Sequence, residues 1–168
     1  MAEAVAWAGH PRVALVLYPD RGALRRGLAR LSVFLEDPRD AGAVLPQVPS
    51  AASHPAAAYS GHNFRPRDLR RFLRQARAAG VPLEPEEARL AALLRAHGLL
   101  GPEGADGEGE GDDPGAPGGD GEDRGCVALA RGLGKAEARE TLAHECMHGL
   151  FYAYPALRAA CGAFWTTR

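Results

Sequence analysis

Residues 126–152 read CVALARGLGKAEARETLAHECMHGLFY, and this stretch decides the fold that we expect. The apolar run 126–130 predicts a short strand. The run 135–152 is rich in Ala, Glu and Leu, which favour helices, and it predicts a helix of about five turns. A Gly-containing connection of four residues separates the two. The stretch therefore predicts a buried strand that leads directly into a long helix.

Upstream, residues 13–18 (VALVLY) predict a second buried strand, which the turn at Pro19-Asp20 closes. The spacing of leucines and alanines and the placement of Pro and Gly predict further helices between Leu24 and Pro38, between Pro66 and Gly80, between Pro85 and Gly98, and after Pro155. The order is strand, helices, strand, helices. It predicts a helix-dominated α+β domain with a few short strands.

The segment 101–123 divides the chain into two parts. All 23 of its residues are Gly, Asp, Glu, Pro or Ala, and nine are acidic; without these nine charges the net charge of −1 becomes +8. Such a segment cannot bury enough apolar surface to offset its ordering entropy, so we expect a disordered, acidic, Gly-rich loop. The 168 residues are then a single domain in which segments 1–100 and 124–168 pack together.

Composition also bears on where the protein works. The longest strongly apolar run, residues 13–17, is far too short to span a bilayer, and the N-terminus does not have the pattern of a signal peptide. Three cysteines cannot form a closed set of disulfides, which favours a reducing compartment. We therefore expect a cytoplasmic protein with no membrane partner.

The residues that carry chemistry are His144, Glu145 and His148, in the order His-Glu-Cys-Met-His. On a helix the two histidines are one turn apart and project from the same face, so both imidazoles can bind one metal ion. Glu145 lies about 100° further round the helix, within reach of a water on that metal. Imidazole ligands favour zinc over magnesium or calcium. The motif therefore predicts zinc as the cofactor.

This motif resembles the active-site helix of the zincin metallopeptidases, which carries His-Glu-x-x-His. The resemblance is strict over five residues and loose over about thirty, from Cys126 to Pro155. It implies a zincin-like, zinc-dependent hydrolase that cleaves a peptide or protein substrate. His144 and His148 would be zinc ligands, and Glu145 would be the general base that takes a proton from the metal-activated water.

The third zinc ligand is not where the zincin families place it, because no His, Asp or Glu follows His148. We favour an incomplete chain as the explanation. An intact domain that uses an upstream ligand is the second alternative, and His62, in a polar turn before a helix, is its best candidate. A degenerate site that binds metal weakly is the third.

Two further features have alternative interpretations. Tyr154, or its neighbour Tyr152, would supply a hydrogen bond to the oxyanion, as Tyr or His does in some zincins, or would be a core aromatic residue. Six arginines surround a single acid, Asp68, in the helix that follows Pro66; they are Arg65, Arg67, Arg70, Arg71, Arg74 and Arg77. No aromatic residues interleave with them, so a solvated basic face is favoured over nucleic-acid binding. The alternative function for the whole chain is a catalytically silent helical interaction module with a vestigial metal site.

Overall fold

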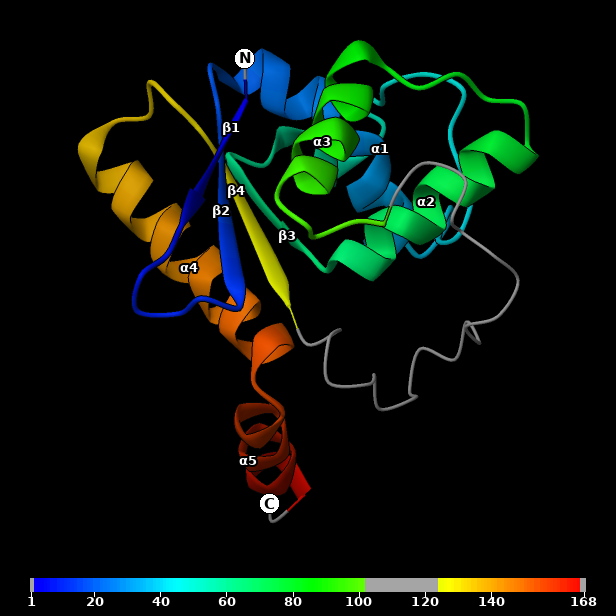
Figure 1. Ribbon diagram of the computed structural model, residues 1–168. Coiled ribbons are helices and arrows are strands. Elements are labelled where there is room, and N and C mark those ends of the chain that lie inside the picture. Colours follow the sequence, from blue (N-terminus) through cyan, green and yellow to red (C-terminus); the bar gives the residue numbers. More distant parts are fainter. Residues whose placement is uncertain (1, 102–123, 167–168) are drawn as a thin grey trace.

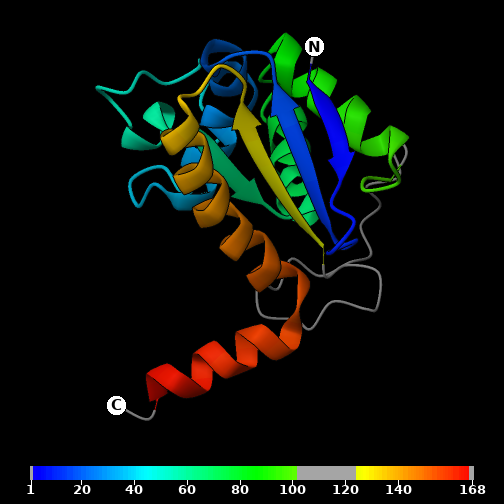
Figure 2. The same ribbon diagram turned by 90° about the vertical axis from the view of Figure 1, so that its left-hand side faces the viewer.

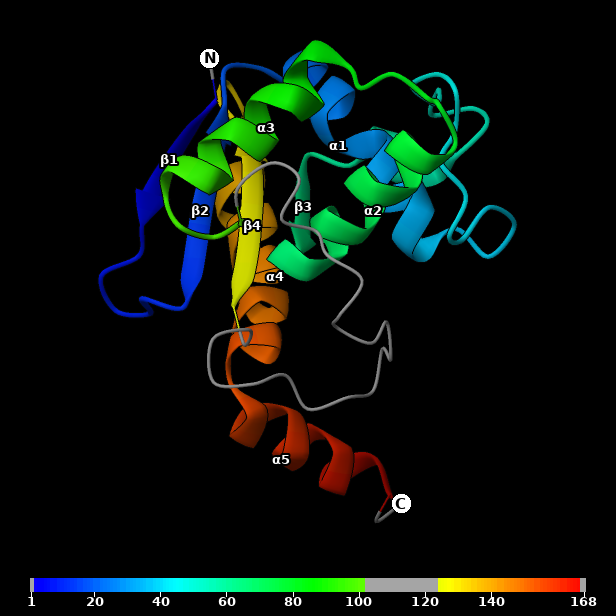
Figure 3. The same cartoon turned by 45° about the vertical axis from the view of Figure 1, so that its right-hand side comes forward.

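The computed structural model describes residues 2–101 and 124–166. Within these residues four strands form one mixed sheet with the order β1-β2-β4-β3. The strands are β1 (Glu3–Ala6), β2 (Val13–Tyr18), β3 (Gly61–Phe64) and β4 (Gly125–Ala130). β2 and β4 are parallel, whereas β1 and β3 run antiparallel to their neighbours. Figures 1 and 3 show β3 at one edge of the sheet, beside β4.

Strand β4 is central, and all six of its residues are buried. Its side chains alternate between the two faces, as the pleat of a strand requires. Cys126, Ala128 and Ala130 belong to one hydrophobic cluster, and Val127 and Leu129 belong to the other. Its pairing with β2 joins residues 13–18 to residues 125–130. This confirms the expectation that the two segments of the chain pack together.

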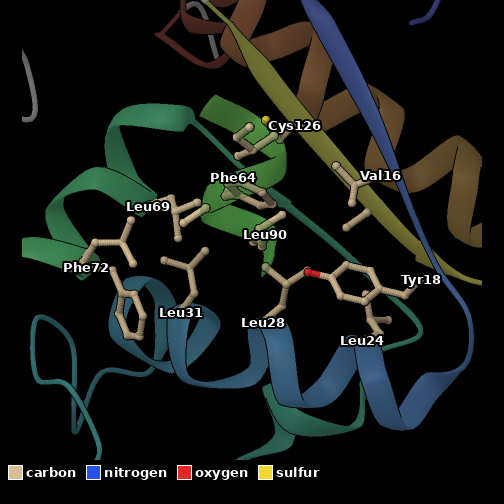
Figure 4. Packing of buried hydrophobic residues seen from close by; sticks show 14 of the residues in the cluster. Val16, Tyr18, Leu24, Leu28, Leu31, Phe64, Leu69, Phe72, Leu90 and Cys126 are labelled. Carbon is tan, nitrogen blue, oxygen red and sulfur yellow. The ribbon is translucent and has the colours of Figure 1, made fainter. Parts of the chain in front are cut away.

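Three helices pack on the face of the sheet that carries Cys126, Ala128 and Ala130, and they account for most of the core. They are α1 (Arg21–Glu36), α2 (Pro66–Ala78) and α3 (Pro85–Ala96). Figure 4 shows leucines of α1 packed against Val16 and Tyr18 of β2 and against Phe64 of β3. α1 begins where the Asp20 carboxylate accepts a hydrogen bond from the backbone of Ala23 at 2.8 Å, which satisfies a free amide of the first turn.

Helix α4 (Lys135–Ala153) covers the opposite face of the sheet, and α5 (Pro155–Thr166) leads away from it (Figures 1 and 2). α4 lies very close to β4 because two glycines meet there. A Cβ on Gly125 would lie 2.5 Å from the carbonyl oxygen of Gly149, and a Cβ on Gly149 would lie 2.8 Å from the Val127 side chain. The missing side chains therefore set the distance between the helix and the sheet.

The structure has the predicted α+β architecture and the predicted helices and buried strands, but it corrects one local prediction. Residues 61–64, interpreted as a polar turn, form strand β3. Strand β1 was not predicted at all. The acidic segment, apart from Gly101, lies outside the described residues. None of the helices in the described part of the chain is long and apolar enough to cross a membrane.

Candidate metal centre

The two histidines of the motif lie side by side on the solvent-exposed side of α4. Their Nε2 atoms are 3.2 Å apart, and the ring centroids are 4.8 Å apart. In a tetrahedral zinc site with Zn–N bonds of about 2.0–2.1 Å, two ligand nitrogens are about 3.3 Å apart. The Nε2 atoms of His144 and His148 therefore already have the separation of two ligands on one metal ion.

Glu145 points in a different direction, towards strand β3. Only 7% of its surface is exposed, and its Oε2 accepts a hydrogen bond of 2.6 Å from the Asn63 amide. A short hydrogen bond to a carboxylate is among the stronger side-chain interactions. Asn63 therefore holds one carboxylate oxygen in place, although the two residues are 82 positions apart in the sequence.

Strand β3 approaches α4 closely at this point. A Cβ on Gly61 would lie 2.5 Å from Thr141 Cγ2 and 2.8 Å from Glu145 Cγ, so only glycine fits. The hydroxyls of Ser60 and Thr141 share a hydrogen bond of 3.1 Å just beside this contact. Residues 60–63 thus hold the Glu145 side of the helix against the edge of the sheet.

A pocket of about 660 Å³ opens between these elements. Its walls come from Glu36 at the end of α1, from residues 58–63, and from one side of α4, which contributes Thr141, His144, Glu145, His148 and Tyr152. The pocket therefore brings together both histidines, the carboxylate of the motif and a second carboxylate. Glu36 could not be recognised from the sequence as a residue of this pocket, because an acid at the end of an amphipathic helix is typical of an ordinary surface residue.

His62 also lines this pocket, but its side chain belongs to the other face of β3. Its Nδ1 shares a hydrogen bond of 2.6 Å with Ser32 of α1, whereas the adjacent Asn63 reaches α4. Burial lowers the pKa of His62 to about 4, so the ring is neutral at pH 7. Among the described residues no three His, Cys, Asp or Glu side chains lie together as a metal-binding group, and His62 is thus not placed with His144 and His148.

Of the two tyrosines, the structure places Tyr152 and not Tyr154 in the pocket. The Tyr154 hydroxyl lies 3.3 Å from Nδ1 of His10, in the connection between β1 and β2, and its ring packs with the second hydrophobic cluster. The structure therefore brings Tyr152, and not Tyr154, to the pocket: Tyr152 lies one helical turn after His148 on the same face of α4, whereas Tyr154 follows the end of the helix with an extended backbone. Burial raises the pKa of Tyr152, so its hydroxyl keeps its proton.

The pocket is bordered by one residue of the arginine-rich helix. The Arg65 guanidinium lies 5.5 Å from the centre of the Tyr152 ring and is bonded to Asp68, with Nε and Oδ2 2.6 Å apart. Further along α2, Arg71 lies over the Phe34 ring at 4.9 Å. These arginines take part in the packing of α2 and do not simply form a solvated basic face.

Comparison of the chain with protein-family models, with curated proteins and with solved structures finds no significant match. The function must therefore be inferred from the site itself.

Charge within the pocket is unevenly distributed. None of the described residues that line it is Lys or Arg, whereas both Glu36 and Glu145 contribute a carboxylate. Burial, and then the charge of Glu145, raises the pKa of Glu36. The imidazoles and carboxylates that line the pocket are donor types that bind divalent metal ions, and among the described residues no three of them lie together as a metal-binding group.

Proposed function

We propose that the protein is a zinc-dependent hydrolase, and that its most fitting substrate is a peptide or protein bond. The observation that carries this proposal is the separation of 3.2 Å between the Nε2 atoms of His144 and His148, beside the Glu145 carboxylate in one pocket. The zincin-like character of the fold is part of the same proposal.

Each residue of the pocket then has a separate role. His144 and His148 hold the zinc ion, which when bound would acidify a water and polarise a substrate carbonyl. Glu145, which lines the same pocket and is fixed by Asn63, would take the proton of the attacking water. The Tyr152 hydroxyl, which stays protonated, donates a hydrogen bond to the oxygen on which negative charge develops. Asn63 fixes the orientation of the base.

The first experiment measures zinc per chain and peptide hydrolysis for the wild type and for Glu145→Gln. The variant should keep its zinc and lose at least about 100-fold in the rate of hydrolysis, the loss expected when a general base is removed. Glu3→Gln is the matched control, since Glu3 is an exposed glutamate of β1, at the edge of the sheet opposite to β3. Full hydrolysis by zinc-loaded Glu145→Gln would show that the assigned base is wrong.

A catalytically silent interaction module is the second candidate function. It is favoured by the finding that the described residues contain no metal-binding group of three side chains, because a catalytic zinc normally has three protein ligands. A protein that folds cooperatively, binds less than one zinc per chain and hydrolyses no peptide in a mixed library would support this candidate over the hydrolase.

A further inference from the structure

Glu36 is the last residue of α1, and it brings a carboxylate from outside the motif into the pocket of the two histidines. In the described part of the chain its carboxylate makes no hydrogen bond or ion pair. The charge of Glu145, which has the same sign, acts on it. A carboxylate beside another carboxylate is unfavourable unless a cation lies between or near them.

The other potential ligands of the pocket are already engaged. Asn63 holds Glu145 at 2.6 Å. His62 is bonded to Ser32 through Nδ1, is only 4% exposed and projects from the face of β3 opposite to Asn63. Turning His62 towards the histidines of α4 would break a buried hydrogen bond and disturb the core. Glu36 makes no hydrogen bond or ion pair with the described residues that a movement would break, so it can turn at a lower cost than His62.

We propose that Glu36 is the third protein ligand of the metal ion held by His144 and His148. This inference rests on the proposed function, because it assumes the metal site on α4. The described residues do not form a group of three ligands. The proposal therefore requires that the Glu36 side chain turn towards the histidines when the metal binds. Its three side-chain torsions and its position at a helix end allow this movement. The carboxylate would approach zinc to about 2.0–2.2 Å.

The test is a titration of the full, metal-free chain with Co²⁺, followed by competition with Zn²⁺. Absorption of bound Co²⁺ in the visible range reports the number and type of ligands, and the competition gives the zinc affinity. Glu36→Gln should weaken zinc binding at least about tenfold, since changes even in residues that only support a ligand cost 10–100-fold. Glu3→Gln, on β1 at the opposite edge of the sheet, should bind as the wild type does.

Glu36→His separates a ligand from a residue that acts only through its charge. An imidazole can bind the metal but carries no negative charge, so this variant should keep most of the affinity and change the Co²⁺ spectrum. If Glu36→His were as weak as Glu36→Gln, or if Glu36→Gln kept the wild-type affinity, the inference would be overturned.

The same titration distinguishes this failure from failure of the proposed function. Loss of binding in His144→Ala, together with wild-type binding in Glu36→Gln, would overturn the role of Glu36 alone. Zinc binding that is indifferent to His144→Ala would overturn the metal site itself. A folded His62→Gln variant that lost binding, with Glu36→Gln unaffected, would assign the third ligand to His62.

Discussion

Replacing Gly61 by Ala should both destabilise the protein and disturb the candidate site. The new Cβ would lie 2.5 Å from Thr141 Cγ2 and 2.8 Å from Glu145 Cγ, where ordinary contacts begin at 3.4 Å. Strand β3 and helix α4 must therefore separate by up to about 0.9 Å, or both side chains must leave their positions. Overpacking of this kind costs about 1–3 kcal/mol. At about 2–4 °C per kcal/mol for a chain of this size, Tm should fall by several degrees.

Thermal unfolding followed by circular dichroism measures this loss, and Gly134→Ala is the control. Gly134 has φ of −58° and nothing within 4 Å of a Cβ, so an alanine fits there without strain. Thr141→Ser should restore part of the stability of Gly61→Ala. It removes Cγ2 and keeps the hydroxyl that shares a hydrogen bond with Ser60.

Two results would contradict the close contact between β3 and α4. A Gly61→Ala protein that melts with the wild type would show that β3 does not press on α4. An unchanged loss after adding Thr141→Ser, measured as a double-mutant cycle, would show that Thr141 is not the obstacle. If the protein is a hydrolase, Gly61→Ala should also lose activity by up to about 100-fold, because a displacement of about 1 Å at a catalytic group has that effect.

Three further perturbations test other parts of the structure. Gly125→Ala should lower the free energy of unfolding in urea more than Gly61→Ala does, because its Cβ meets the backbone of Gly149. No second substitution can remove backbone atoms to relieve this contact. Burial lowers the pKa of His62 to about 4 from an ordinary 6.5, so between these pH values the unfolded chain binds the proton more readily than the folded one. The free energy of unfolding should therefore fall by up to about 3 kcal/mol as the pH falls from 6.5 towards 4. The urea midpoint of His62→Asn should fall less over the same pH range. Arg30→Met should lower the free energy of unfolding in urea by about 3–5 kcal/mol, because Glu87, which is 1% exposed, then loses the ion pair that it forms with Arg30 at 2.6 Å. Changing both residues to apolar ones should recover much of this loss.

Long periodic segments and helix boundaries could be predicted from the sequence. Leu24, Leu28 and Leu31 repeat at helical spacing and are all buried in the structure. The helix of the motif begins at Lys135 as predicted and ends one residue later than predicted. These elements were accessible because their periodicity and their Pro and Gly boundaries are local properties of the chain.

The edge strands were not accessible in the same way. β3 has the sequence Gly-His-Asn-Phe, which has a weak strand propensity, and it is a strand because it pairs with β4. Its side-chain directions decide the candidate site: Asn63 reaches Glu145, and His62 turns to Ser32. Such contacts join residues 30 and 82 positions apart, and no local pattern in the sequence contains them.

The central position of β4 also has a consequence for the order in which the protein can fold. On a ribosome, β1, β2 and β3 are made early, but β2 and β3 are not neighbours in the sheet, and the strand that belongs between them is residues 125–130. Until that strand emerges, β2 offers an unpaired edge, which is a site for pairing with other chains, and residues 61–64 lack the partner that makes them a strand. The fold must then close a loop of more than 100 residues between β2 and β4. Contacts so distant in sequence slow folding, so newly made chains should depend on chaperones until synthesis has passed β4.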